Sequence, residues 1–148
     1  MKKSREVIIK SECFTKMKEL TINSKEKETG GLMYGRMNPR WLRIYDISDP
    51  GSNSIRNKNS IIFDMDYLED YSNKKISKNY FIVGTWHSHP PNSTLYPSSI
   101  DKETMLKLAR KYKYLYPPIF AIVCINKGKF DFQFYEPNDE KINKVTID

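Results

Sequence analysis

The two histidines of the chain, His87 and His89, stand one residue apart in the stretch GTWHSHPPNSTLYPSSID, which spans residues 84–101. Residues at i and i+2 of an extended segment project to the same side, so both imidazoles can converge on one point. Neutral imidazole is a good zinc ligand, and Asp101, in the first turn of the next predicted helix, supplies a third ligand. Two histidines and one carboxylate with an open fourth position are the arrangement of hydrolytic zinc sites.

Hydrolysis also needs a general base, because the attacking water must lose a proton and the leaving amine must gain one. Glu28, in the stretch KETGG just before a predicted strand, is the candidate. Gly30 and Gly31 would allow another backbone to approach closely there, since neither has a Cβ atom. Glu26 is the competing candidate, although nothing anchors it to the entrance of a strand.

Ser98 allows two interpretations, which are compatible if the start of the helix faces the metal. Ser98 and Asp101 form a Ser-x-x-Asp variant of the capping box, with Ser98 as the N-cap residue. Alternatively, the Ser98 hydroxyl stabilises the negative charge that develops on a reacting carbonyl oxygen. The neighbouring Ser99 is an alternative for that second role.

The elements that must position these groups can be predicted from hydrophobic periodicity and turn residues. The first half of the chain predicts a strand, a helix, two strands, a loop, a short strand and a helix. The expected ranges are a strand at 5–10, a helix at 11–24, strands at 31–36 and 41–48, a loop at 49–60, a strand at 60–64 and a helix capped by Asp64 or Asp66.

The second half predicts a central strand at 79–89 whose end carries the histidines. A proline-rich loop follows, and a helix begins at Ser98 or Ser99 with an apolar stripe of Met105, Leu108, Ala109 and Tyr112. The segments PPIFAIVCIN and KFDFQFYEP predict a hairpin around NKGK, and KVTI near the end could add an edge strand. The order of elements indicates a single α/β domain over residues 1–148, with a mixed sheet sandwiched by helices.

Composition narrows the classes of protein that the chain can belong to. The chain of 148 residues contains no apolar run near the roughly 18 residues that a membrane-spanning helix needs, and no apolar segment of a signal peptide follows its basic start. Cys13 and Cys124 each lie in an apolar pattern, which favours reduced core thiols and a cytoplasmic location. The net charge of +7 comes from scattered lysines, which indicates a solvated surface more than nucleic-acid binding.

Together, Glu28, His87-Ser-His89 and Ser98-x-x-Asp101 resemble the motif of the JAMM metalloproteases of the MPN family. The contexts ETGGLMYGR, the Trp before HSHP, and PSSID resemble its prokaryotic, stand-alone JAB-type branch. The resemblance extends from about Glu28 through the segment IFAIVCIN. Eight residues separate His89 from Ser98, one more than in the usual family pattern, which we interpret as an insertion in the loop.

The resemblance implies a cytidine-deaminase-like MPN fold and a zinc isopeptidase or peptidase. His87, His89 and Asp101 would hold Zn²⁺, Glu28 would be the base that passes a proton to the leaving amine, and Ser98 would steady the tetrahedral intermediate. The substrate would be the C-terminal tail of a ubiquitin-like protein, or of a protein conjugated by bacterial E1-like and E2-like enzymes. Some similar bacterial proteins belong to antiphage operons, and one group removes a cyclic-nucleotide synthase from its covalent targets.

Two other functions fit parts of the pattern. Many MPN domains lack the ligands and serve as non-catalytic scaffolds, but here every ligand is present. A DNA-associated MPN-like domain is slightly favoured by the charge, but no extension beyond the one domain supports it. For the enzyme, we expect the polar loops at 49–60 and 90–97 to flank the metal and to bind the substrate tail by addition of a strand.

Overall fold

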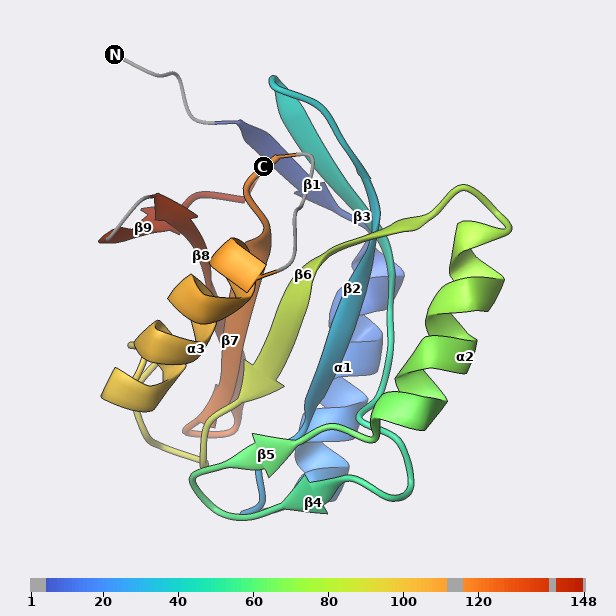
Figure 1. Ribbon diagram of the computed structural model, residues 1–148. Helices are drawn as coiled ribbons and strands as arrows, with labels where there is room; N and C mark the ends of the chain where they lie inside the picture. Colours follow the sequence, from blue (N-terminus) through green and yellow to red (C-terminus); the bar gives the residue numbers. More distant parts are fainter. Residues whose placement is uncertain (1–4, 112–115, 139–140, 148) are drawn as a thin grey trace.

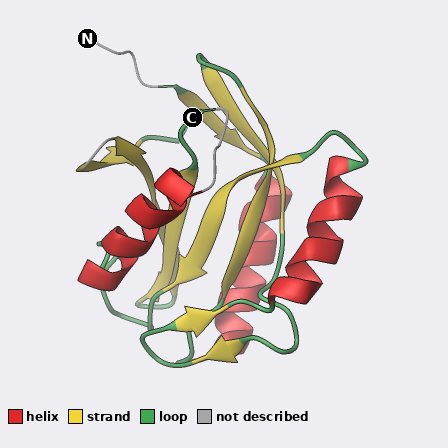
Figure 2. Cartoon of the chain, viewed as in Figure 1, coloured by secondary structure: helices red, strands yellow, loops and turns green. Residues whose placement is uncertain are grey.

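The structure is a computed structural model that describes residues 5–111, 116–138 and 141–147. Three helices are interspersed among the strands along the described part of the chain (Figures 1 and 2). The elements are β1 (Glu6–Ile9), α1 (Ser11–Ser24), β2 (Gly30–Met37), β3 (Trp41–Ile47), β4 (Ile55–Arg56), β5 (Ile61–Ile62), α2 (Met65–Ile76), β6 (Phe81–Ser88), α3 (Ser99–Lys111), β7 (Ile119–Asn126), β8 (Lys129–Asn138) and β9 (Lys141–Val145).

Within the described residues, seven strands form one mixed sheet in the order β1-β3-β2-β6-β7-β8-β9, and β4 and β5 form a separate antiparallel pair. Strand β6 lies at the centre, antiparallel to β2 and parallel to β7. A bridge between Val7 of β1 and Ile147 brings the two edges of the sheet together. The sheet is therefore strongly curled, and the predicted mixed α/β fold is confirmed.

The helices cover both faces of the sheet, because side chains of a strand alternate between its faces. In β7, Ala121 and Val123 pack in the same core as Met17 of α1, whereas Phe120 and Ile122 pack with Met105 of α3. Helix α2 contacts β6 and leads directly into that strand (Figure 1). Strand β6, whose end carries the histidines, is thus held between β2 and β7 in the middle of a sheet that helices cover on both faces.

Two glycines allow the close strand contacts that place the site. Gly30 is the register partner of His87, and a Cβ atom at Gly30 would overlap the carbonyl oxygen of Trp86. A Cβ atom at Gly31 would likewise overlap the carbonyl oxygen of Ser48. The close approach predicted for these two glycines is confirmed, and it brings the start of β2 against the end of β6.

Several predicted boundaries needed correction. The expected strand at 60–64 is only the two-residue β5, and the expected loop at 49–60 contains β4, its pairing partner. Strand β6 ends at Ser88, so His89 lies just beyond it. Asp64, not Asp66, caps α2 by accepting a hydrogen bond from the backbone N–H of Tyr67.

At the C-terminal side, the predicted hairpin of β7 and β8 is confirmed, and the edge strand is β9, three residues earlier than expected. Met105 of the predicted α3 stripe is buried, and Leu108 packs against the same cluster. Tyr112 lies outside the described residues. Cys13 and Cys124 are both free and buried, as expected of core thiols.

Candidate metal centre

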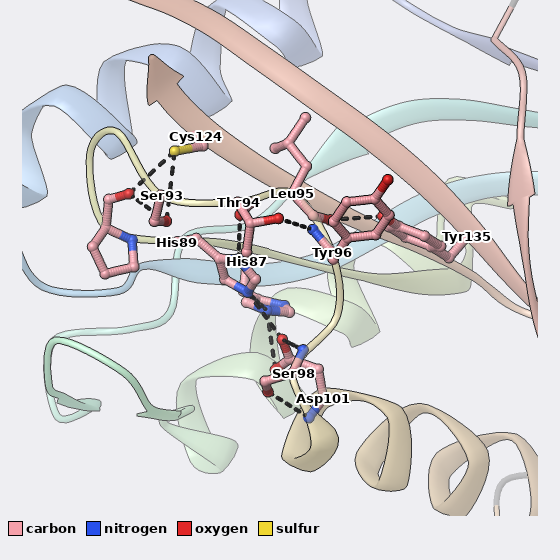
Figure 3. Close-up of polar contacts among 11 residues, drawn as sticks. His87, His89, Ser93, Thr94, Leu95, Tyr96, Ser98, Asp101, Cys124 and Tyr135 are labelled. Atoms are coloured by element: carbon pink, nitrogen blue, oxygen red, sulfur yellow. Dashed lines mark hydrogen bonds and ion pairs between the residues drawn. The ribbon is translucent and has the colours of Figure 1, made fainter. Parts of the chain in front are cut away.

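Three side chains converge at the end of β6, as the sequence predicted (Figure 3). The Nε2 atoms of His87 and His89 lie 3.3 Å apart. The Asp101 carboxylate lies 3.2 Å from His87 Nε2 through Oδ1 and 2.9 Å from His89 Nε2 through Oδ2. The ligand atoms all lie within 4.8 Å of one another, so the three side chains could together hold a metal ion.

Asp101 reaches the histidines because the start of α3 is tied by a reciprocal capping box. The Ser98 backbone N–H donates to Asp101 Oδ2 at 3.0 Å, and the Asp101 backbone N–H donates to Ser98 Oγ at 3.0 Å. The Ser98 carbonyl accepts the N–H of Lys102. These bonds satisfy free N–H groups of the first turn and also orient the Asp101 carboxylate.

A backbone carbonyl orients His89. Its Nδ1 lies 2.7 Å from the Thr94 carbonyl oxygen, which can only accept, so Nδ1 carries the proton. In the neutral ring the lone pair is then on Nε2, the atom that faces His87 and Asp101. A second hydrogen bond of this kind is typical of histidines that bind metals, because it fixes both tautomer and ring orientation.

The charges of the three groups suit a divalent cation. Burial opposes ionisation of Asp101, but hydrogen bonds from His87 and His89 hold the pKa of that carboxyl well below its usual range. Burial lowers the pKa of His89, yet the Asp101 hydrogen bond and the Thr94 carbonyl outweigh it and raise that pKa above 6.5. A proton on His89 would compensate the Asp101 carboxylate, and a cation held by the two Nε2 atoms and a carboxylate oxygen would take the place of that proton.

This donor set matches zinc chemistry. Two imidazole nitrogens and one carboxylate oxygen are ligands that zinc accepts in catalytic sites, which leave a fourth position open. His89 is buried, and His87 and Asp101 are half-buried, so the three side chains are held in place by their surroundings. The residues fit the group that the sequence predicts, although the arrangement does not by itself select zinc over other metals that accept nitrogen ligands.

Glu28 lies directly before β2 and is buried, with 6% of its surface exposed. Its backbone N–H donates to the Asn57 carbonyl at 2.8 Å, between β4 and β5. Burial is the main cause that raises the pKa of Glu28; His87 opposes the shift and the charge of Asp101 adds to it. Glu28 is thus within electrostatic reach of the metal ligands, whereas the competing Glu26 is exposed.

The structure also places Ser98 beside the ligands. Its Oγ accepts the Asp101 N–H, so the capping interpretation is confirmed, while the hydroxyl proton remains free for another acceptor. Ser99 is the first residue of α3 and is exposed. The catalytic role predicted for Ser98 stays a prediction, as does that of Glu28.

Sequence reasoning missed two contributors to the site. The Thr94 carbonyl has no signal in the sequence, because any residue carries one. Ser88, between the two histidines, did offer a signal. Side chains of a strand alternate between its faces, so this polar side chain must point to the face opposite the histidines, where it needs a hydrogen-bond partner. It is buried, and its Oγ accepts the backbone N–H of Thr29 at 2.9 Å.

Comparison with known proteins identifies the family. Residues 10–136 match the family model described as prokaryotic homologs of the JAB domain. The chain belongs to this prokaryotic JAB family. The JAB family includes zinc metalloproteases, and the cluster of His87, His89 and Asp101 lies where such a metal could bind.

A solved structure supports the same fold. The solution structure of protein DSY2949 from Desulfitobacterium hafniense matches with a TM-score of 0.74 at 13% sequence identity, covering 95% of this chain and 90% of that chain. At this identity the match concerns the fold alone. No curated protein matches the chain. Within the described residues, no helix is both long and apolar enough to cross a membrane.

Proposed function

We propose that this JAB protein is a zinc-dependent peptidase that hydrolyses an isopeptide or peptide bond after the C-terminal tail of a ubiquitin-like or conjugated protein. The observation that carries the proposal is the convergence of two histidine nitrogens and one carboxylate within 4.8 Å. The buried Glu28, two residues before the Gly30 that pairs with His87, lies within electrostatic reach of them. A bound zinc ion would supply Lewis acidity, polarising the scissile carbonyl and lowering the pKa of water.

In this mechanism Glu28 is the general base and then the general acid. Burial raises the pKa of Glu28 toward neutral pH. A group with such a pKa can both accept a proton from water and return it to the leaving amine. The Ser98 hydroxyl, whose proton the capping box leaves free, donates to the oxygen of the tetrahedral intermediate. The proton therefore moves from water to a Glu28 oxygen and then to the amine nitrogen as the C–N bond breaks.

An extended tail would fit beside Glu28. The β4–β5 pair is only two residues long on each strand, and Ile55 and Ile62 are 58% and 62% exposed. A short strand pair with free edges can accept a further strand from a substrate, with apolar side chains on its surface. Its turn holds the N–H of Glu28 through Asn57, so a tail added there would lie close to the base.

We propose a conjugated protein as the substrate from the JAB resemblance together with the short β4–β5 pair beside Glu28. A protein attached by bacterial E1-like and E2-like enzymes carries such a tail, and a cyclic-nucleotide synthase of an antiphage system is one such protein. The recombinant chain should be tested on ubiquitin-like proteins joined through their C-terminal glycine to the lysine side chain of a fluorescent peptide.

The zinc-loaded wild type should cleave the bond after the glycine, and Glu28→Gln should keep its zinc but lose about 10² to 10⁴-fold in rate, because glutamine cannot take the proton. Glu26→Gln is the matched control and should behave as wild type. Bound zinc without cleavage of any tail would instead support a non-catalytic scaffold, and normal cleavage by Glu28→Gln would move the base to Glu26.

A further inference from the structure

Ser88 makes an unusual contact between the central strands. In a regular antiparallel pair, two opposite residues exchange both backbone hydrogen bonds. At the end of the β2–β6 ladder the Ser88 N–H donates to the Thr29 carbonyl at 2.7 Å. The return bond, however, runs from the Thr29 N–H to the Ser88 side-chain Oγ at 2.9 Å.

Because the Thr29 N–H bonds to a side-chain hydroxyl and not to a backbone carbonyl, the backbone just after Glu28 departs from the regular strand direction. A side-chain oxygen lies off the plane of the backbone ladder, so the Thr29 N–H points toward the face that Ser88 occupies. The alternation of β6 puts His87 on the opposite face from Ser88. The direction in which the chain leaves β2 at Thr29 is therefore set by the residue between the two histidines.

Two hydrogen bonds then fix the backbone of Glu28 from both sides. The Thr29 N–H is held by Ser88 of β6, and the Glu28 N–H is held by the Asn57 carbonyl at 2.8 Å. Ser88 and Thr29 are 2% and 1% exposed, so water does not offer the Thr29 N–H an equal partner. The position of the Glu28 carboxylate depends on both bonds, because no regular strand extends beyond Gly30 to hold it.

We propose that Ser88 is a positioning residue, whose hydroxyl fixes Glu28 over the metal site without contacting substrate or metal. The inference rests on the proposed function, because it assigns Ser88 to the hydrolysis that Glu28 performs. The same residue belongs to the segment that carries both histidines, so a single short segment supplies two ligands and, through the hydroxyl between them, the hydrogen bond that positions the base. A displacement of about 1 Å can cost about 10²-fold in rate, which makes such a link consequential.

The chain offers a matched control for a test. Ser48 is also fully buried, and its Oγ also accepts a backbone N–H of β2, that of Leu32, at 2.9 Å. Ser88→Ala and Ser48→Ala therefore remove equivalent hydrogen bonds to the same strand, one beside Glu28 and one three residues further along. Ser88→Thr keeps a hydroxyl and serves as the conservative variant.

Kinetics on the fluorescent tail conjugate should separate the two alanine variants. We expect kcat of Ser88→Ala to fall by about 10²-fold at an unchanged KM and unchanged zinc content, while Ser48→Ala stays within about threefold of wild type. Ser88→Thr should recover most of the lost rate. Equal losses in both alanine variants, or zinc loss in Ser88→Ala alone, would overturn the positioning role.

Two measurements decide the inference even if the wild type hydrolyses no tail, in which case the proposed function fails first. Amide hydrogen exchange at Thr29 and Glu28 should speed up by about tenfold or more in Ser88→Ala relative to Ser48→Ala. Crystal structures of the zinc-loaded variants should show the Glu28 carboxylate displaced only in Ser88→Ala. Unchanged exchange and an unmoved carboxylate would refute the link between Ser88 and Glu28.

Discussion

Two clusters of charged side chains lie around the central sheet, and they differ in how their charges are balanced. In the first, at the edge of the sheet beside α2, the Asp46 carboxylate pairs with Lys75 at 2.6 Å and Lys16 at 3.6 Å. It also accepts the Tyr71 hydroxyl at 2.8 Å. This α2 cluster contains its own cations, so its interactions are complete without a ligand.

The second cluster, the metal centre, has no lysine or arginine paired to it among the described residues. Its carboxylate Asp101 pairs with the two imidazoles, and the buried Glu28 lies within electrostatic reach of the same groups. The difference teaches how to distinguish the two roles: a cluster that supplies its own counter-charges ties elements together, whereas one that lacks a cation is ready to bind one. Three predictions test the contrast.

The largest effect should come from removing a ligand. Asp101→Ala should lower zinc affinity by well over about 10²-fold, because even loss of a group that merely orients a ligand costs up to about that much. Zinc per chain and competition with a chelator would measure the loss. Asp131→Ala removes an exposed carboxylate from β8 and is the control. Retention of zinc by Asp101→Ala would contradict the ligand assignment.

The second effect is the dependence of zinc binding on pH. The raised pKa of His89 means that the metal-free protein keeps its proton above the ordinary pKa of 6.5. Below the raised pKa, zinc affinity should therefore fall by about tenfold per pH unit for this one proton. Without zinc the sign reverses: the stability that His89 contributes is complete below pH 6.5 and is lost as the pH rises through the raised pKa.

Chelator competition and thermal unfolding, each measured from pH 5 to 8, would test both signs. The Asp46→Asn variant is a useful control here, because the α2 cluster contains no histidine and should leave the zinc titration unchanged. A zinc affinity that is constant across this range would contradict the proton competition at His89.

The smallest effect should come from the α2 cluster. Burial opposes ionisation of Asp46, but its bonds from Lys75 and Tyr71 and the charge of Lys16 lower its pKa below 3.8. Its contribution to stability is therefore present above pH 3.8 and is lost as the pH falls through the lowered pKa. Asp46→Asn should cost about 1–3 kcal/mol in the free energy of unfolding and leave zinc content unchanged.

Denaturant unfolding at pH 7 and pH 3 would measure this prediction, with Asp70→Asn, which changes an exposed carboxylate of α2, as the control. The difference between Asp46→Asn and wild type should shrink at the acid end. Loss of zinc in Asp46→Asn would show that the two clusters are coupled rather than separate.

The sequence predicted the convergence of the three candidate ligands better than it predicted their surroundings. His87, His89 and Asp101 could be found because the chain has only two histidines, and these stand one residue apart before a helix start that carries a carboxylate. The Thr94 carbonyl that orients His89 could not be found, since backbone groups leave no mark in the sequence. The pairing of β4 with β5 was also missed, because strands of two residues carry no periodicity.

The fold class followed from hydrophobic periodicity, but the order of strands and the closure of the sheet did not. The contact between Val7 and Ile147 joins the two ends of the chain and depends on the twist of the whole sheet. Similarly, the role of Glu28 rests on the pairing of Gly30 with His87, which is a register that only the folded sheet defines.

The placement of the ligands has a consequence for the order of folding. His87 and Asp101 are 14 positions apart in the chain, whereas Glu28 lies 59 positions before His87. Closing a short loop costs less chain entropy than closing a long one, so the three ligands can meet before β2 docks onto β6. If the proposed function holds, we therefore expect a nascent chain to bring its three candidate ligands together early and to gain its general base only when β2 pairs with β6.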